Sequence, residues 1–184
     1  MKSVKPGNSG RGAWLCVSAL TFVVLAAIGL VGCAEKVDDN ISKSAASPSS
    51  GANFKGEKIT IKTVTASASS APTSLPTNVT DGDIKTPWSA GGPAPQWIQL
   101  DLGAESPVSK VRLNVSQTPP GPTTHEVYGG PTPDQLKLLG TLEGTTQDSQ
   151  WIELSVSAQN VRYLKIATVK SPSWVAWREI EVFK

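Results

Sequence analysis

The chain has few cysteines and histidines, and each scarcity excludes a class of protein. Its two cysteines are Cys16 and Cys33, so none follows residue 33. A domain built from the later residues therefore has neither a disulfide nor a thiolate metal site. The single histidine, His125, is the one base available to a hydrolytic triad, and no Gly-x-Ser-x-Gly sequence accompanies it. Gly91-Gly92 and Gly129-Gly130 lie outside any phosphate-loop motif and indicate no nucleotide site.

The chain also lacks a basic cluster, and so has no electrostatic footprint for nucleic acid. Its formal net charge is +2, but three of its 17 basic residues lie before residue 12. Without these three, the chain has 14 basic and 15 acidic residues, which gives a net charge of −1. Paired carboxylates such as Glu179 and Glu181 share a strand face, whereas a glycosidase needs an acid and a base across a cleft. We therefore expect a protein without catalytic activity.

Residues 1–32 have the organisation of an export signal. A basic start without acidic residues precedes an apolar run over 13–32. The run ends at Leu30-Val31-Gly32-Cys33, which resembles the lipobox of bacterial lipoproteins. That resemblance implies cleavage before Cys33, attachment of lipid to its thiol, and an extracytoplasmic position on the cell membrane or outer membrane. An uncleaved transmembrane anchor is the alternative, because about 20 apolar residues can span a bilayer.

A flexible tether is predicted between this signal and the domain, over residues 33–56. Ser, Ala, Gly and charged residues dominate this segment, and they bury too little apolar surface to form a core. From residue 57 apolar and polar residues alternate, as in half-buried strands. We expect a lipoprotein signal peptide over 1–32, a tether beginning with the lipidated Cys33, and one domain over 57–184.

The domain is predicted to be all-β, an eight-stranded jelly-roll sandwich. About eight short alternating segments are separated by Gly and Pro, and no segment has a helical stripe. The apolar positions are Ile59 and Ile61; Ile98, Leu100 and Leu102; Val111, Leu113 and Val115; Val127; Leu136, Leu138 and Leu139; Ile152, Leu154 and Val156; Leu164 and Ile166; and Ile180 and Val182.

A cation site is suggested by the turn that precedes Trp88. Asp81, Asp83 and Thr86 place two carboxylates and a hydroxyl around Gly82, and hard oxygen ligands suit a hard cation such as calcium. The alternative is a plain turn, because Asp and Gly favour turns for reasons of their own. A bound cation would stabilise the fold and take no part in chemistry.

Several stretches, taken in order, carry a family resemblance. They are Ala66-Ser67, Asn78-Val79-Thr80-Asp81-Gly82-Asp83, Thr86-Pro87-Trp88, Trp97-Ile98-Gln99-Leu100-Asp101-Leu102-Gly103, Val108 to Leu113, Glu126-Val127-Tyr128, Val161 to Ile166 and Arg178-Glu179-Ile180-Glu181-Val182. Over residues 58–184 the chain resembles the discoidin, or coagulation factor F5/8 type C, family, which includes the family 32 carbohydrate-binding modules. The resemblance implies a jelly roll with a structural calcium ion. The implied ligands are Asp81, Asp83, Thr86 and Glu179, with backbone oxygens near Asn78 and Thr86.

The same resemblance implies that loops at one end of the sandwich form a binding surface. Sugar recognition needs an aromatic face and fixed polar groups. Trp174 is the predicted aromatic contact, although it could instead pack onto the edge of the domain. The predicted polar partners are Gln96, Gln117 and Ser173, in the loops 89–96, 116–123 and 170–174.

The other candidate residues are predicted to be structural. Trp88, Trp97 and Trp177 fall at framework positions in the core or at its rim. Trp151 lies on the face opposite the core, where it either covers an edge or makes a second ligand contact. His125 is two residues from Val127 on the same predicted strand, so both lie on one face and His125 is expected to point inward.

Two functions of different classes follow from the sequence. The first is a membrane-tethered extracytoplasmic binding module for carbohydrate. The alternative is an envelope protein–protein interaction or scaffold lipoprotein, for which an exposed Trp151 patch would be expected. A hydrolase, which would depend on His125, has the least support.

Overall fold

The computed structural model of the protein describes residues 56–184. The predicted signal peptide, the lipidation site at Cys33 and all of the predicted tether except Gly56 lie outside the described residues. Within the described part, no helix is long and apolar enough to span a bilayer.

The all-β sandwich is confirmed, with seven strands in place of the eight expected and one short 3-10 helix. Alternation of apolar and polar residues places one face of each strand in the core. The elements are β1 (Thr63–Ala66), η1 (Pro76–Thr80), β2 (Trp88–Ser89), β3 (Gln96–Val115), β4 (Gly121–Gly130), β5 (Lys137–Thr146), β6 (Trp151–Lys170) and β7 (Ala176–Phe183).

Two long strands and one unexpected short strand account for the difference in number. β3 and β6, of 20 residues each, both contain two of the expected short segments, which removes two strands, and β2 (Trp88–Ser89) adds one. Against β6, β3 shifts register between Asp101 and Ser106 and again between Val108 and Lys110. Gly103 lies between the halves with φ +81°, a left-handed conformation that suits glycine. The breaks in the alternation therefore mark bends in continuous strands.

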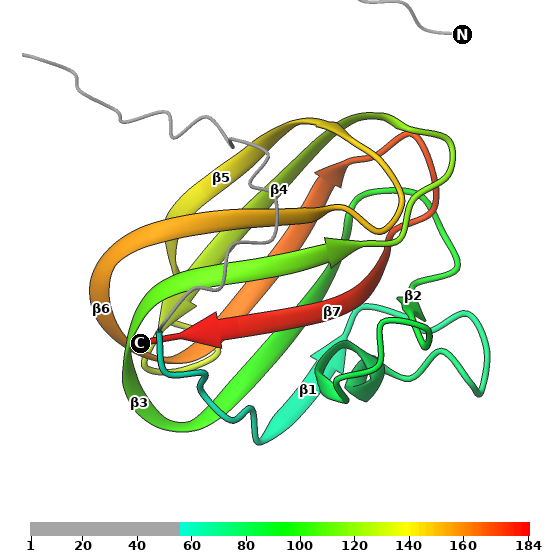
Figure 1. The fold of residues 1–184 in the computed structure, drawn as a ribbon. Coiled ribbons are helices and arrows are strands. Elements are labelled where there is room, and N and C mark those ends of the chain that lie inside the picture. The colour runs from blue at the N-terminus through cyan, green and yellow to red at the C-terminus, as the bar shows by residue number, and fades with distance from the viewer. Residues whose placement is uncertain (1–55) are drawn as a thin grey trace, which may run out of the picture. The chain divides into compact units, whose positions relative to one another are not determined.

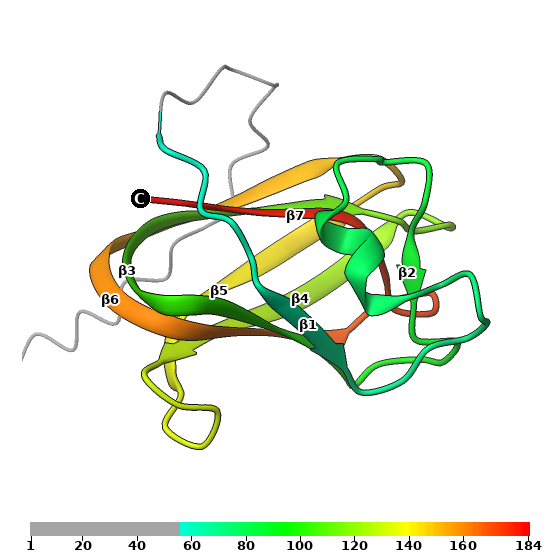
Figure 2. The ribbon, with the colours of Figure 1, turned by 90° about the horizontal axis from the view of Figure 1, so that it is seen from below.

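Because of these bends, β3 and β6 contribute to both layers of the sandwich. The strand order is β2-β7-β3-β6-β4-β5, with β1 also paired to β3. The first half of β3 pairs with β1 and the second half of β6, whereas its second half pairs with β7 and the first half of β6. Figure 2 shows both strands curving round one end of the domain. The core between the layers includes Leu100, Leu113, Ile152, Leu164 and Ile180.

The chain enters and leaves the domain at the same end. Lys58 forms a β-bridge with Phe183, and the Lys184 N–H donates to the Glu57 carbonyl at 3.0 Å. The loops that precede β4, β6 and β7 lie at the opposite end (Figure 1). The eight residues of β7 run between the two ends, a length of about 26 Å at roughly 3.3 Å per residue.

Candidate functional site

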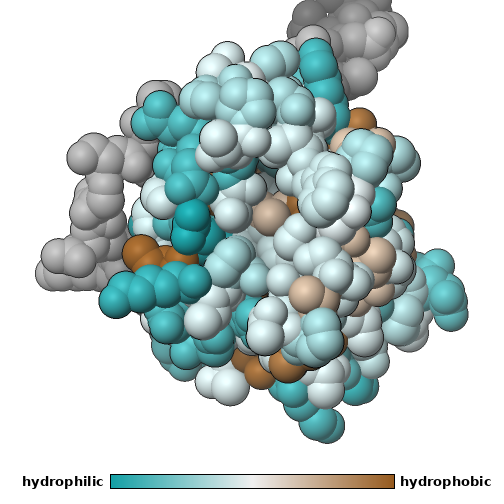
Figure 3. Space-filling view, turned by 90° about the vertical axis from the view of Figure 1, so that its right-hand side faces the viewer, coloured by the Kyte–Doolittle hydropathy of each residue, from teal (hydrophilic) through white to brown (hydrophobic). Residues whose placement is uncertain are grey.

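The loop end of the sandwich carries an open groove of about 500 Å³. Three segments that are distant in sequence meet there: the start of the β3–β4 connection, the β5–β6 turn and the β6–β7 connection. Figure 3 looks onto this end, where most of the surface is hydrophilic or intermediate in hydropathy. The lining residues are Ser116, Gln117, Thr118, Pro119, Asp148, Pro172, Ser173, Trp174 and Arg178.

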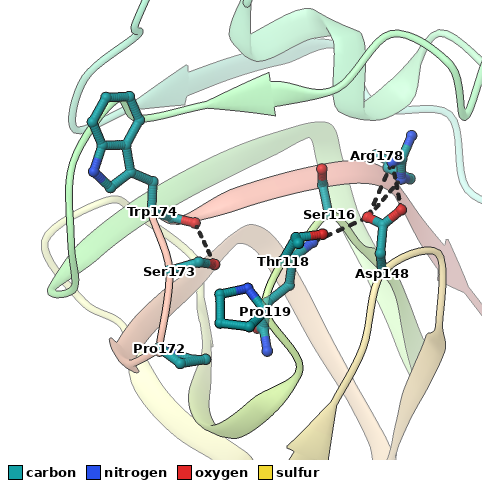
Figure 4. A pocket seen from close by; sticks show the side chains of 9 residues that line it. Ser116, Thr118, Pro119, Asp148, Pro172, Ser173, Trp174 and Arg178 are labelled. Carbon is teal, nitrogen blue, oxygen red and sulfur yellow. Dashed lines mark hydrogen bonds and ion pairs between the residues drawn. The ribbon is translucent and has the colours of Figure 1, made fainter.

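Trp174 lies at one end of the groove and leaves 61% of its surface exposed. Its neighbour Val175 is buried, accepts a hydrogen bond from the Ala90 N–H at 2.9 Å and donates one to the Gly92 carbonyl at 3.0 Å. The Ser173 hydroxyl donates to the Trp174 carbonyl at 3.2 Å. The backbone on either side is therefore held in place, and the indole projects into solvent beside the groove (Figure 4).

The other end of the groove is formed by an ion pair. Arg178 Nη2 donates to both carboxylate oxygens of Asp148, at 3.0 and 2.9 Å. Burial raises the pKa of Asp148, but the bonds from Arg178 and from the Gln117 N–H outweigh it and hold the pKa below its usual value. The Asp148 carboxylate is therefore ionised at neutral pH and fixed in position (Figure 4).

Gln117, a predicted ligand contact, is one of the residues that line the groove. Its side-chain amide, however, forms hydrogen bonds inside the domain. The residue is 5% exposed. Its Nε2 donates to the Thr146 carbonyl at 3.1 Å, and its Oε1 accepts from the Thr146 hydroxyl at 3.0 Å. The side chain braces the β3–β4 connection against β5. The prediction of a ligand-binding Gln117 amide is corrected accordingly, because its polar atoms are occupied inside the domain.

Gln96 lies outside the groove, contrary to the prediction that it joins Trp174. Its Oε1 accepts a short hydrogen bond from the Ser67 hydroxyl, and its Nε2 donates to the Pro93 carbonyl at 3.3 Å. The side chain closes the loop before β3. Of the predicted contacts, the structure brings Trp174 and Ser173 together at the groove and leaves Gln96 apart.

His125 lies below the groove, beside a cavity of about 10 Å³. Its Nδ1 is 3.0 Å from the Thr168 hydroxyl, and its ring meets the Trp177 ring edge-on at 4.7 Å. Burial lowers the pKa of His125 to about 3. Its Nε2 has no hydrogen-bond partner. A neutral, buried imidazole of this kind agrees with the predicted structural role and has no access to a substrate in the groove.

At the predicted cation site, oxygens converge on one hydroxyl. Thr86 Oγ1 lies 2.9 Å from Asp81 Oδ2 and 2.9 Å from the Asp83 carbonyl, and the Asp83 N–H donates to Asp81 Oδ1 at 2.8 Å. A hydroxyl has one hydrogen to donate. Either Asp81 Oδ2 or the Asp83 carbonyl oxygen can accept that hydrogen at one time, and the one that does not is available to a cation.

Glu179 reaches this turn from β7, as the family resemblance implied. It is 2% exposed, and its Oε2 accepts from the Gly82 N–H at 3.3 Å. Its Oε1 is buried without a hydrogen-bond partner, 3.6 Å from Lys58 Nζ. Burial raises the pKa of Glu179, and Lys58 opposes that shift. Within residues 56–184 no three His, Cys, Asp or Glu side chains form a metal-binding group, so a cation would also need hydroxyl and backbone oxygens.

Trp151 does not form an exposed aromatic patch. The Arg112 guanidinium covers its ring at 4.5 Å. Arg112 also pairs with Glu153 at 2.8 Å and with Glu181 at 2.9 Å across neighbouring strands. This face of the sheet is therefore a paired array of charges, and the Trp151 ring lies beneath its Arg112 guanidinium. Glu181 belongs to this array and does not face a cleft.

Sequence reasoning missed Asp148 and Arg178 as groove residues. Arg178 belongs to a closing motif that indicates framework, and Asp148 lies in a polar turn of the kind that connects any two strands. The two residues are 30 positions apart. No local pattern links them, because the turn before β6 and the start of β7 become neighbours only in the folded sheet.

Comparison with known proteins identifies relatives of this domain. The family 32 module of AlyQ, solved with 4,5-unsaturated mannuronic acid, is 28% identical with a TM-score of 0.61; the match covers 69% of this chain and 98% of that one. A pectin-binding carbohydrate-binding module is 25% identical with a TM-score of 0.59, over 67% and 91% of the chains. A Clostridium perfringens family 32 module, solved with GalNAc-β-1,3-galactose, has 17% identity, a TM-score of 0.60 and coverage of 70% and 100%, and shows the fold alone.

The family itself is shown by sequence. No match was found among curated proteins. The model of the F5/8 type C domain, however, matches residues 63–180, well over half of the chain. Except for Glu181 and Val182, the motifs that suggested this family lie in that range, and the jelly-roll architecture agrees with them. The chain therefore belongs to the F5/8 type C domain family.

Proposed function

We propose that this domain is a carbohydrate-binding module that binds glycan in the groove beside Trp174. The observation that carries the proposal is an exposed indole, held by fixed backbone, next to a groove that also has hydroxyls and an ordered ion pair. Most large apolar side chains of the domain are buried, so an indole that is 61% exposed indicates a contact surface. The glycan ligands of the related modules agree with this proposal.

Binding would use two kinds of contact. The C–H face of a sugar ring would pack on the Trp174 indole, and its hydroxyls would bond to polar groups along the groove. Because the loops are already hydrogen-bonded, little ordering would accompany binding. We assign no catalysis to this domain, since its one histidine is buried and neutral.

Trp174→Ala tests the proposed site. We expect affinity for glycans detected on an array to fall at least about tenfold, or about 1.4 kcal/mol. Leu138→Ala is the matched control, because Leu138 is 54% exposed on β5 and does not line the groove. Glycan binding that survives Trp174→Ala, or no binding on a broad array, would reject the proposal.

The proposal includes a lipid anchor at Cys33 and an extracytoplasmic position. The motif around Cys33 supports it. In the described domain the chain enters at the end opposite the groove, so attachment at that end uses none of the groove residues. Cys33→Ala should move the protein from the membrane fraction to the soluble fraction and abolish incorporation of labelled palmitate. Unchanged membrane association and labelling would exclude this anchor.

A structural calcium ion is the last part of the proposal. Asp81, Asp83, Thr86 and Glu179 would hold it together with backbone oxygens. The site suits a hard cation because Glu179 Oε1 is buried without a hydrogen-bond partner and Thr86 Oγ1 lies between two acceptors. When bound, calcium would supply positive charge that joins the first loop to β7.

A further inference from the structure

We infer that the groove selects neutral glycans and excludes acidic and amino sugars; this inference rests on the proposed function. Among the residues that line the groove, Asp148 and Arg178 are the charged ones, and they have opposite signs. They pair directly, with Nη2 to Oδ2 at 2.9 Å. The lining therefore has no net charge with which to attract a charged sugar.

The hydrogen bonds of Arg178 involve both edges of the guanidinium that could hold a carboxylate in a fork. A guanidinium has five N–H donors. Nε points to Asp148 Oδ1 at 3.4 Å, Nη2 donates to both oxygens of Asp148, and Nη1 donates to the Ile84 carbonyl at 3.0 Å. The two oxygens of one carboxylate lie too close together for both N–H groups of Nη2 to point at them, so one N–H remains on each of Nη1 and Nη2. A uronate held in a fork on the Nε–Nη2 edge would have to displace Asp148, and one on the Nη1–Nη2 edge would compete with the Ile84 carbonyl.

Charge repulsion adds to this competition. The Asp148 side chain is 40% exposed on the same groove, so a second carboxylate would approach a negative charge. A protonated amino sugar would meet the Arg178 guanidinium, while the Asp148 carboxylate already has its cation. Both kinds of charged ligand would break an existing ion pair and form a similar one, with little net gain.

Neutral hydroxyls match the same groups without breaking the pair. A sugar hydroxyl can accept one hydrogen bond and donate another. It could accept from a remaining N–H of Arg178 while donating to Asp148 Oδ2. The hydroxyls of Ser116, Thr118 and Ser173 between the ion pair and Trp174 offer further uncharged partners (Figure 4). The groove thus combines an aromatic face with donors and acceptors that suit polyhydroxylated, uncharged rings.

The test compares neutral polysaccharides (galactan, mannan, xylan and β-glucan) with alginate, polygalacturonate and chitosan by affinity electrophoresis and calorimetry. We expect at least one neutral polymer to bind, with an affinity that changes less than about twofold between about 50 and about 500 mM salt. Each charged polymer should bind at least about tenfold more weakly. Trp174→Ala should remove the neutral binding.

Asp148→Asn provides the second arm. It leaves Arg178 without its counter-ion, so we expect about tenfold weaker neutral binding and new, salt-sensitive binding to alginate or polygalacturonate. Asp134→Asn, in the exposed β4–β5 loop away from the groove, is the matched control. A thermal melt of each variant verifies folding. If Asp148→Asn fails to fold, the wild-type comparison decides.

The two hypotheses fail in different ways. Preferred binding of wild-type protein to a charged polymer that Trp174→Ala abolishes would overturn the charge selection and leave the proposed site intact. Binding that survives Trp174→Ala, or no binding to any polymer, would overturn the proposed function and the inference with it.

Discussion

At the residue scale, the tryptophans of the described domain differ in burial and therefore in role. Trp88 and Trp177 are fully buried and confirm the framework prediction. Trp97 is half-buried with the Lys165 ammonium over its ring at 4.9 Å, and Trp151 lies beneath Arg112. Trp174 alone among the tryptophans of the described domain is mostly exposed. The side chain is the same in each case, and its neighbours decide whether the ring packs in the core, lies beneath a cation or faces solvent.

His125 should make stability depend on pH. Its pKa is about 3 in the folded state and about 6.5 when unfolded, so the unfolded chain binds the extra proton first. Stability is therefore full above about pH 6.5 and falls as the pH drops toward 3, by about 1.4 kcal/mol per pH unit. We expect a loss of about 2 kcal/mol at pH 5 in urea denaturation.

His125→Gln is the comparison variant. It should be less stable at pH 7 but should lack most of the loss between pH 6.5 and 5. The lowered pKa values of Asp101 and Asp148 act at lower pH and do not interfere in this window. If the free energy of unfolding of wild type and of His125→Gln changes equally with pH, His125 is not a neutral buried group.

At the element scale, glycines allow strands and loops to approach closely. A Cβ on Gly130, at the end of β4, would lie 2.0 Å from the Gln135 carbonyl oxygen, which belongs to backbone and cannot rotate away. We expect Gly130→Ala to lower the free energy of unfolding by about 2 kcal/mol or more, through displacement of the β4–β5 loop. Chemical denaturation measures this loss.

Thr132→Ala, at an exposed position in the same loop, is the control for Gly130→Ala and should change stability by less than about 0.5 kcal/mol. Equal stability of Gly130→Ala and wild type would show that the loop relaxes freely.

At the scale of the whole molecule, the proposed calcium ion would connect two parts of the domain that are far apart in sequence. The turn at Asp81 and the β7 residue Glu179 already meet through the Gly82 N–H. Calcium at about 100 times its Kd should add about 2.7 kcal/mol, which raises the Tm by several degrees in a domain of this size. Melting curves with calcium and with EDTA test this.

Asp81→Ala should remove the difference between the calcium and EDTA curves, whatever its effect on the Tm in EDTA, because Asp81 also bonds within its turn. Asp134→Ala should preserve the difference. Identical wild-type curves in calcium and EDTA would refute the calcium assignment.

Strand alternation and the turn motifs made the all-β class and the family predictable, because both depend on neighbouring residues. Ile98, Leu100 and Leu102 alternate toward the core as expected. The continuity of β3 was not predictable, because bulges between Asp101 and Ser106 bend a strand where the alternation stops. A local pattern does not distinguish a bend from a strand end.

Short, contiguous patterns in the sequence were enough to identify the fold family and to single out Trp174 as the candidate aromatic. Which polar groups accompany that aromatic became clear from the folded structure. It turned the Gln117 amide inward onto Thr146 and brought Asp148 to Arg178 from 30 residues away. The physical reason is that the partners of a polar side chain are set by the atoms around it after folding, and sequence distance does not encode them.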